Sequence, residues 1–463
     1  MATERHLFSS RIGFVLAGAA SAVGLGNLWR FPYLAAEYGG AIFVLIYLSL
    51  VLTLGFTLMV TEIAIGRKTG KSAFWAFRDL SEKWHFLGIL SLLIPCIILP
   101  YYSVIGGWIM RYIALFMSGS GHLVANDVNS SKEFFSSFIA NNFDPIIWTI
   151  IFMLMTALVL LFGVKNGIQR VCTIIMPALI VMIIGIAIYC ICQPKGIDGL
   201  CYYLVPDFSK FSGELVIAAM GQMFYSLSLA MGIMITYGSY LHKKENIEKS
   251  VRAIGFFDTG VSFLAGLLVV SAVFMISKGE PASLGEGPGL MFVNMPNVFV
   301  HMPGGEIVGV AFFICVFFAA LTSAISLFEV PVATLIDKFK MSRVKAVGLI
   351  LLGELIVGVI VNLGYGVWKD FTIFKLKILE FMDAISNNIM MPILALLTCI
   401  FIGWIVKGKT KVVTDEIEGV ELSGDAKETS NVHHFKEKKF YIVMVKFIAP
   451  VCLVAIFIYM VYS

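Results

Sequence analysis

Charged residues are scarce in this chain of 463 residues. Asp, Glu, Lys and Arg make up 14% of the sequence and hydrophobic residues 59%, whereas a soluble protein has about 25% charged and about 45–50% apolar residues. The composition excludes an ordinary soluble domain and indicates an integral membrane protein. The formal net charge is only +4, and the basic residues lie in short loops between apolar stretches, so no nucleic-acid partner is expected.

Histidine and cysteine are also few, with 7 and 8 residues. Every histidine lies in a tail or in a loop between apolar stretches, and no spacing of Cys and His matches a zinc site. The apolar stretches contain no nucleophile–base pair and no aspartate dyad. The sequence therefore predicts that the protein is not an enzyme.

What the chain has in abundance is long apolar stretches. A membrane-spanning helix needs about 20 apolar residues, and eleven stretches are candidates. They lie at about 11–37, 40–66, 86–117, 145–162, 168–192, 213–240, 250–277, 305–337, 343–361, 374–406 and 440–461. We therefore expect an all-α integral membrane protein with eleven transmembrane helices, in which residues 1–463 form a single transmembrane domain.

Lysine and arginine are distributed unevenly over the connecting loops. The loops after the second, sixth and eighth stretches are rich in both, whereas 118–144 and 278–304 contain one lysine each. Since basic loops stay in the cytoplasm, we expect a multi-pass plasma-membrane protein with a cytoplasmic N-terminus and an extracellular C-terminus. Residues 407–439 are charged and turn-rich, which predicts a flexible cytoplasmic connector to the last helix at 440–461.

Two stretches are interrupted by small and polar residues at membrane depth. The interruptions are SAVGLGN at 21–27 and GQMFYSLSLAMG at 221–232. Non-helical backbone at this depth survives only around a cavity or inside protein, and broken helices at corresponding positions of two halves point to a transporter's binding site. We expect inverted five-helix repeats at about 11–192 and 213–406, with the last helix outside them.

The chemistry of a broken helix indicates what binds there. A helix start near Leu25 presents N–H groups that favour a carboxylate, and helix ends near Ala22 and Tyr225 present carbonyl groups that favour a cation. A cleft that has both fits a zwitterion such as an amino acid. Small residues also permit close helix packing, so GLG alone is a weak signal, and the second break strengthens it.

Four motifs resemble those of a known family. AVGLGNLWRFPY at 22–33, PYY at 100–102, GQMFYSLS at 221–228 and LTS at 321–323 resemble signatures of the first, third, sixth and eighth helices of the neurotransmitter:sodium symporters. The likeness covers essentially the whole chain, and eleven spans are similar to the bacterial amino-acid branch. The resemblance implies the LeuT-type fold, with broken helices 1 and 6 and one extra C-terminal helix.

The resemblance also implies two sodium sites made of oxygen ligands. The first would use the Ala22 carbonyl with the side chains of Asn27, Ser226 and Asp258. The second would use the carbonyl groups of Ala20, Val23 and Ala319 with the hydroxyl groups of Thr322 and Ser323. A lone Ser or Thr more often bonds to its own helix, so this expectation depends on the matching motifs.

Asp258 departs from the pattern of chloride-dependent relatives. Those have a neutral amide at this position, whereas this chain has Asp258, with Ser262 one turn later. A buried carboxylate beside sodium can supply the negative charge that chloride would otherwise bring. We therefore expect chloride-independent transport.

A substrate site is implied between the two breaks. Its expected residues are Ala22, Leu25, Gly26, Ile98, Tyr102, Tyr225, Ser226, Ser228, Met231 and Leu327. Carriers of monoamines have an acid where this chain has Gly24, so the substrate should bring its own carboxylate. Met231 is pliable and fills irregular gaps, which favours a bulky apolar or aromatic amino acid.

Ionisable residues at membrane depth should face water or one another. The resemblance implies gates and a hinge, formed by Arg30 and Asp383 on the outside, by Arg5, Ser239, Tyr240 and Asp337 on the inside, and by Gly167 and Pro177 in the fifth helix. Glu62, deep in the second stretch, is expected to bond to the broken backbone of the sixth.

Together these features predict a sodium-coupled symporter of a hydrophobic or aromatic L-amino acid that works by alternating access. A proton-coupled transporter of the same fold and a non-transporting amino-acid sensor are the alternatives. The expected partners are an amino acid, two sodium ions and the lipid bilayer. The protein is expected to be a monomer or a weak homodimer.

Overall fold

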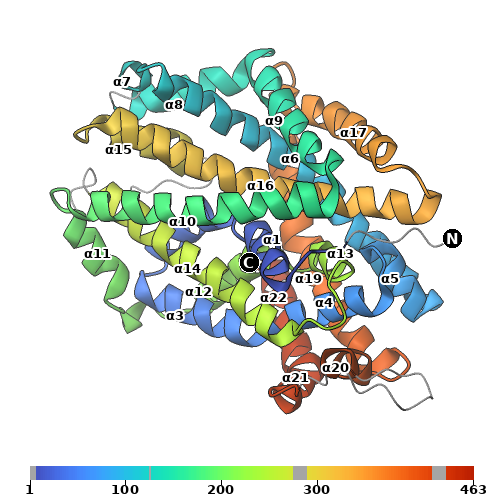
Figure 1. The fold of residues 1–463 in the computed structure, drawn as a ribbon. Helices are drawn as coiled ribbons and strands as arrows, with labels where there is room; N and C mark the ends of the chain where they lie inside the picture. The colour runs from blue at the N-terminus through green and yellow to red at the C-terminus, as the bar shows by residue number, and fades with distance from the viewer. Residues whose placement is uncertain (1–6, 125–126, 275–288, 420–433, 463) are drawn as a thin grey trace.

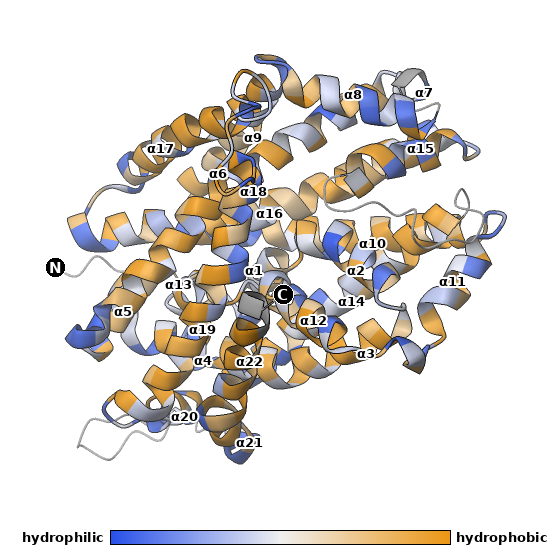
Figure 2. Ribbon diagram, turned by 180° about the vertical axis from the view of Figure 1, so that it is seen from behind, coloured by the Kyte–Doolittle hydropathy of each residue, from blue (hydrophilic) through white to orange (hydrophobic). Residues whose placement is uncertain are grey.

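The chain folds into a layered assembly of long helices (Figure 1), seen here in a computed structural model that describes residues 7–124, 127–274, 289–419 and 434–462. Apolar residues predominate along the long helices (Figure 2). Nine helices among the described residues are long and apolar enough to span a membrane, and ten if Arg11–Ala22 and Gly26–Glu37 count as one bent span. The expected all-α membrane fold is confirmed.

The helices lie close to the eleven expected stretches. In chain order the segments are α1 (Arg11–Ala22) with η1 (Gly26–Arg30) and α2 (Phe31–Glu37); α3 (Ala41–Leu50), η2 (Val51–Gly55) and α4 (Phe56–Thr69); α6 (His85–Met117); α9 (Asp144–Leu161); η4 (Val164–Gln169) with α10 (Arg170–Ile191); α12 (Gly213–Ser226) with α13 (Ile233–Gly238); α14 (Ile247–Phe274); α16 (Gly305–Phe339); α17 (Arg343–Leu363); α18 (Ile378–Asp383), η8 (Ala384–Met390), α19 (Met391–Ile400) and η9 (Phe401–Ile405); and α21 (Lys438–Val443), η10 (Met444–Ile448) and α22 (Ala449–Tyr462). The expected sixth span is the one missing from the count of ten, because its pieces α12 and α13 have only 14 and 6 residues.

Shorter helices lie in the connections between the spans. They are α5 (Ala73–Leu80), η3 (Glu82–Trp84), α7 (Gly121–Val124), α8 (Val128–Ala140), α11 (Gly196–Leu204), η5 (Phe208–Lys210), η7 (Leu290–Asn294), α15 (Met295–Val300) and α20 (Lys411–Glu418).

The connector at 407–439 differs from the expected flexible segment in its first part. Helix α20 packs against α4, with Val413 and Ile417 buried. The Arg67 Nε donates to the Glu416 carboxylate over 2.8 Å, and both side chains are buried. Burial of this ion pair and of the apolar face holds α20 in place. Residues 420–433 of the connector lie outside the described part of the chain.

Helix α1 lies at the centre of the molecule, where it packs against α10, α14 and α16. Its buried residues are small, among them Ala17, Gly18 and Ala20. A Cβ atom added at Gly18 would lie 2.6 Å from the Ile254 side chain. Small residues let neighbouring helices approach closely where lipid gives no hydrophobic drive for packing. The packing therefore places the first helix break deep inside protein.

Candidate functional site

The first break separates α1 from η1 and bends the chain by 54°. The Gly24 N–H donates to the Asn27 Oδ1 over 2.9 Å, and the Leu25 N–H donates to the Tyr102 hydroxyl over 3.3 Å. A Cβ atom at Gly26 would lie 2.5 Å from the Tyr225 ring. Side chains thus satisfy the N–H groups freed at the break, and only glycine allows Tyr225 to pack there.

The second break separates α12 from α13. Ser228 and Ala230 adopt φ values of 52° and 56°, which are costly for residues with a Cβ atom. The Ser228 hydroxyl donates to the Ser21 carbonyl over 2.9 Å, and the Ala230 N–H donates to the Glu62 Oε1 over 2.7 Å. The expected contact of Glu62 with the broken sixth helix is therefore confirmed, and a hydrogen bond joins the two breaks.

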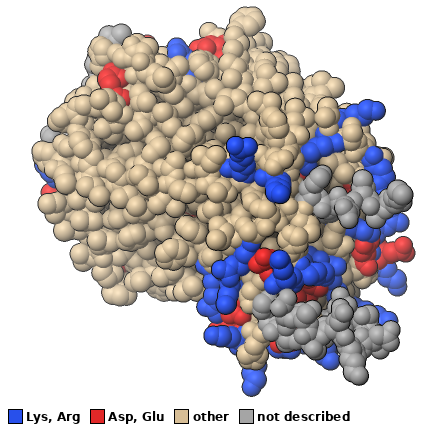
Figure 3. All heavy atoms as spheres, in the orientation of Figure 1, with Lys and Arg blue, Asp and Glu red and all other residues tan. Residues whose placement is uncertain are grey.

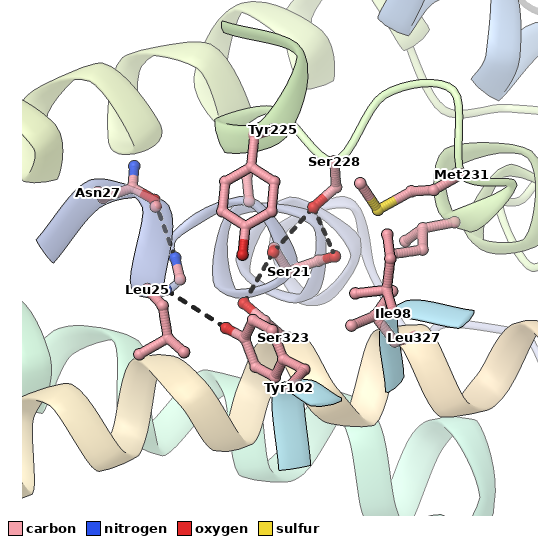
Figure 4. A pocket seen from close by; sticks show the side chains of 14 residues that line it. Ser21, Leu25, Asn27, Ile98, Tyr102, Tyr225, Ser228, Met231, Ser323 and Leu327 are labelled. Atoms are coloured by element: carbon pink, nitrogen blue, oxygen red, sulfur yellow. Dashed lines mark hydrogen bonds between the residues drawn. The ribbon is translucent and has the colours of Figure 1, made fainter. Parts of the chain in front are cut away.

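A small cavity of about 30 Å³ lies between the breaks (Figure 4). Its lining residues are Ser21, Ala22, Gly24, Leu25, Gly26, Asn27, Ile98, Tyr102, Tyr225, Ser228, Met231, Ile233, Ser323 and Leu327. Met231, Ile98 and Leu327 gather at one end and Leu25 and Tyr102 at the other. The cavity therefore has an apolar end and an end that offers hydrogen bonds.

Nine of the ten residues expected at the substrate site line this cavity. Ser226 does not, because its hydroxyl turns away and donates to the Asp258 Oδ1 over 2.7 Å. Ser21 and Ile233 also line the cavity and were not identified from the sequence as site residues. Both immediately flank a helix break, and this adjacency is the signal that could have identified them.

Three of the four residues expected at the first sodium site, Asn27, Ser226 and Asp258, form one buried polar cluster, and the Ala22 carbonyl takes no part in its described hydrogen bonds. The Asn27 Nδ2 donates to the Asp258 Oδ1 over 2.7 Å and to the Ser226 hydroxyl over 2.9 Å. The cluster also contains Tyr47, whose hydroxyl donates to the Asp258 Oδ2 over 2.8 Å, and Ser262, 2.7 Å from the Asn27 amide nitrogen. Tyr47 was not identified from the sequence. An oxygen-rich cluster around a buried carboxylate fits a hard cation.

The residues expected at the second sodium site gather where α1 ends against α16. The Ser323 hydroxyl donates to the carbonyl oxygens of Ser21 at 3.0 Å and Val23 at 3.3 Å. The Thr322 hydroxyl bonds within its own helix, to the carbonyl oxygens of Phe318 at 3.0 Å and Ala319 at 3.2 Å. Ala20 is fully buried in the same part of α1. The donor set consists of oxygen atoms from two helices, which suits a small cation.

The expected outer gate does not close through a direct ion pair in the described structure. Arg30 and Asp383 instead line a cavity of about 360 Å³. The Asp383 Oδ1 accepts hydrogen bonds from the Tyr101 hydroxyl at 3.0 Å and the Asn387 amide at 2.6 Å, whereas the Arg30 guanidinium lies 5.8 Å from the centre of the Tyr225 ring. Both residues thus face a common cavity, as expected for ionisable side chains at membrane depth, and their role as a gate stays a prediction.

The structure describes three of the four residues expected at the inner gate, since Arg5 lies outside the described residues. The Asp337 Oδ2 accepts a hydrogen bond from the Ser72 N–H over 2.8 Å. Ser239 and Tyr240 lie just past the end of α13, and the Ser239 hydroxyl donates to the Thr236 carbonyl over 2.6 Å.

An ion pair that was not identified from the sequence lies beside this inner gate, with the Glu329 side chain fully buried and that of Arg343 20% exposed. The Tyr240 hydroxyl donates to the Glu329 Oε1 over 2.7 Å, and the Arg343 guanidinium lies 2.5 Å from the Glu329 Oε2. Glu329 interrupts an apolar stretch, and this acid could have signalled the pair. Phe8 is buried against Tyr240 and donates its N–H to the Tyr240 carbonyl over 3.0 Å. The N-terminal segment is thus fastened to the inner half of the broken sixth helix.

The expected hinge residues lie in the fifth span. Gly167 is in the π-helical segment η4, and Pro177 is inside α10. A Cβ atom at Gly167 would lie 2.2 Å from the Val159 carbonyl oxygen, so close backbone contact requires glycine there. The wide turn and the proline both weaken the regular hydrogen bonding of this helix.

Comparison with known proteins gives consistent matches over the whole chain. The model of the sodium:neurotransmitter symporter family matches residues 5–133 and 140–463. An uncharacterized sodium-dependent transporter of Haemophilus influenzae is 34% identical over 98% of both chains, and one of Bacillus subtilis is 34% identical over 97% of this chain and 96% of its own. The crystal structure of MhsT in complex with L-phenylalanine superposes with a TM-score of 0.85 at 35% identity, over 98% of this chain and 99% of that chain.

Proposed function

Because this chain is a sodium-dependent transporter that belongs to the sodium:neurotransmitter symporter family, we propose that it is a sodium-coupled symporter of a hydrophobic or aromatic L-amino acid. The observation that carries the proposal is the cavity between the two helix breaks. One end offers the Leu25 amide and the Tyr102 hydroxyl, 3.3 Å apart, and the other is lined by Ile98, Met231 and Leu327. A carboxylate fits the first end and an apolar side chain the second.

The complex of MhsT with L-phenylalanine supports this substrate class, since MhsT is similar to this chain over nearly its full length. A cavity of about 30 Å³ has room for about two water molecules, so a bulky substrate requires lining side chains to move. Met231 is suited to this, because its unbranched side chain has three rotatable bonds. Gly24 leaves no acid in the site, so the substrate supplies the carboxylate.

We further propose that two sodium ions bind, one at each polar cluster. The first site uses Asn27, Ser226, Asp258 and the Ala22 carbonyl. The second uses Thr322, Ser323 and the carbonyl groups of Ala20, Val23 and Ala319. The second cluster is supported by the contacts of Ser323 with Ser21 and Val23. At the first, Asn27 would turn its amide oxygen to the ion, because its amide nitrogen now faces Asp258.

Transport is proposed to be independent of chloride. The Asp258 side chain is fully buried and accepts hydrogen bonds from Asn27, Ser226 and Tyr47. A carboxylate at this position supplies a negative charge beside the cation, so no anion from solution is needed.

Alternating access is proposed as the mechanism, in which the substrate site opens to one side at a time. In the described conformation the outer cavity of about 360 Å³ extends to Tyr225 and Tyr101. On the other side Phe8 is buried against α13, and Glu329 binds both Tyr240 and Arg343. These contacts support an inner side that is closed while the outer side has room for solute.

The proposed orientation places the N-terminus in the cytoplasm and the C-terminus outside. Lys and Arg gather on the side of the molecule where α5, α20 and α21 lie, whereas the opposite side around α11 and α7 shows few (Figure 3). Since cytoplasmic loops are enriched in Lys and Arg, this distribution supports the proposal. We place the protein in the plasma membrane and propose that it is a monomer or a weak homodimer.

Uptake into proteoliposomes tests the proposed function. A panel of labelled amino acids is offered with sodium outside, with potassium in its place, and with gluconate replacing chloride. Sodium-dependent, chloride-independent uptake of phenylalanine, leucine or a similar amino acid is expected. Uptake indifferent to sodium would point to a proton-coupled transporter, and sodium-dependent binding without uptake would point to a sensor.

A further inference from the structure

A buried carboxyl group lies halfway along α17, away from both polar clusters. Glu354 is the twelfth residue of the helix Arg343–Leu363 and is 3% exposed. The Ser103 hydroxyl donates to its Oε1 over 2.5 Å. Its Oε2 is buried and has no hydrogen-bond partner among the described residues. An ionisable group at membrane depth is a candidate functional site unless another role explains it.

No charged side chain within the described part of the chain forms a hydrogen bond or ion pair with Glu354. Helix α17 packs against α6, α9 and α16 (Figure 1). Apart from Glu354, the charged or basic side chains on these four helices are His85, Arg111, Asp144, Glu306, Glu329, Asp337, Lys338, Arg343 and Lys345. Arg111 pairs with Asp144 and Arg343 with Glu329. Arg343 lies about 16 Å from Glu354 along the helix, from its rise per residue.

The other titratable side chains on these helices form no described hydrogen bond with Glu354. They are Cys96, Tyr101, Tyr102, Tyr112 and Cys315. The Tyr101 hydroxyl donates to Asp383 and that of Tyr112 to the Phe292 carbonyl. An ionised carboxylate has about four acceptor sites, whereas one hydrogen bond reaches Glu354. Only the neutral acid fits this environment, because a buried charge without a partner is strongly unfavourable.

We propose that Glu354 is a proton-binding site within the membrane, and that loss of its proton weakens substrate binding through Ser103 and Tyr102. Ser103 directly follows Tyr102 on α6, and the same helix carries Ile98 of the cavity. When the acid ionises and gives its proton to water, the carboxylate draws water into the contact between α6 and α17. The entering water shifts α6, and this shift moves the Tyr102 hydroxyl away from its place beside the Leu25 N–H.

The protonation state can be tested without transport. The infrared spectrum of the purified protein minus that of E354Q is recorded at neutral pH. We expect a carbonyl stretching band of a protonated carboxylic acid in the difference. A carboxylate band in its place would overturn the proposal. The infrared measurement does not depend on the proposed transport function.

The link to substrate rests on the proposed function and is tested by binding of L-phenylalanine with sodium over a range of pH. The affinity of the natural protein should fall by about fivefold to tenfold as the acid ionises, equivalent to about one hydrogen bond. E354Q should bind tightly with no such fall. The control N362A, which removes an α17 amide bonded to Thr149 on α9, should keep the fall. An unchanged pH dependence in E354Q would refute the link.

A second variant covers the case in which E354Q does not fold. S103A keeps the acid and removes its bond to α6, so the infrared band should persist while the pH dependence of binding disappears. Retention of that dependence in S103A would overturn the link through Ser103. If no phenylalanine binds to the natural protein at any pH, the proposed substrate class fails, and the infrared result still decides whether Glu354 holds a proton.

Discussion

The Ser228 hydroxyl donates a hydrogen bond to the Ser21 carbonyl over 2.9 Å, so the side chain at one helix break satisfies a backbone group at the other. The same carbonyl accepts from the Ser323 hydroxyl at 3.0 Å. Three segments far apart in the sequence, around residues 21, 228 and 323, therefore meet at one oxygen atom. Movement at either break must affect the other, because an unsatisfied carbonyl at this depth is costly.

Removing the Tyr102 hydroxyl should weaken substrate binding. In Y102F the aromatic ring remains, but the group that faces the Leu25 amide is lost. A hydrogen bond to a charged group contributes about 1.5–3 kcal/mol, so the affinity for L-phenylalanine should fall by about tenfold to a hundredfold. Equilibrium binding to purified protein measures this. Y441F, which removes a buried hydroxyl bonded to Thr61, is the control, and equal losses in both variants would contradict the role of Tyr102.

Gly26 should tolerate no side chain. In G26A the new Cβ atom would lie 2.5 Å from the Tyr225 ring, so the ring must leave its place over the site. We expect loss of most uptake with little change in the amount of folded protein. G185A is the matched control, since a Cβ atom there meets nothing within 4 Å. Normal uptake by G26A would show that Tyr225 need not close over the substrate.

Neutralising Asp258 should make transport depend on chloride. D258N removes the buried negative charge but keeps the size of the side chain, and its one carbonyl oxygen can still accept from Asn27 or from Tyr47. Uptake by D258N should be low in gluconate and restored in chloride, whereas the natural protein should be indifferent. D144N, which removes an acid paired with Arg111, should behave like the natural protein. Chloride independence in D258N would count against the charge-supply hypothesis.

Removing the Asp337 carboxylate should favour the conformation that opens to the cytoplasm. D337A loses the contact that joins the end of α16 to the Ser72 N–H. A loss of about 1–2 kcal/mol should shift the equilibrium by about fivefold or more. The rate at which a thiol reagent labels a cysteine at Val15, in the inner half of α1, measures this opening.

The matched control for that measurement is D79A, which removes an exposed acid paired with Lys71. Its labelling rate should equal that of the protein with the cysteine alone. An unchanged rate in D337A would remove Asp337 from the inner gate.

The sequence by itself determined the helices and the positions of the breaks. Apolar stretches of spanning length predict helices, because a bilayer leaves backbone groups no partner except their own segment. The glycines at 24 and 26 and the serines at 226 and 228 marked where that rule fails. Even the contact of Glu62 with the sixth helix followed from the need to satisfy broken backbone.

Only the tertiary structure decided which side chains that are far apart in the sequence contact one another. Tyr47 joins Asp258, Glu329 takes both Tyr240 and Arg343, and α20 docks through Glu416 on Arg67. Hydropathy and spacing act along the chain and do not say which individual side chains of different helices meet. Hydrogen bonds and ion pairs depend on distances of about 3 Å, and these are set when the helices pack.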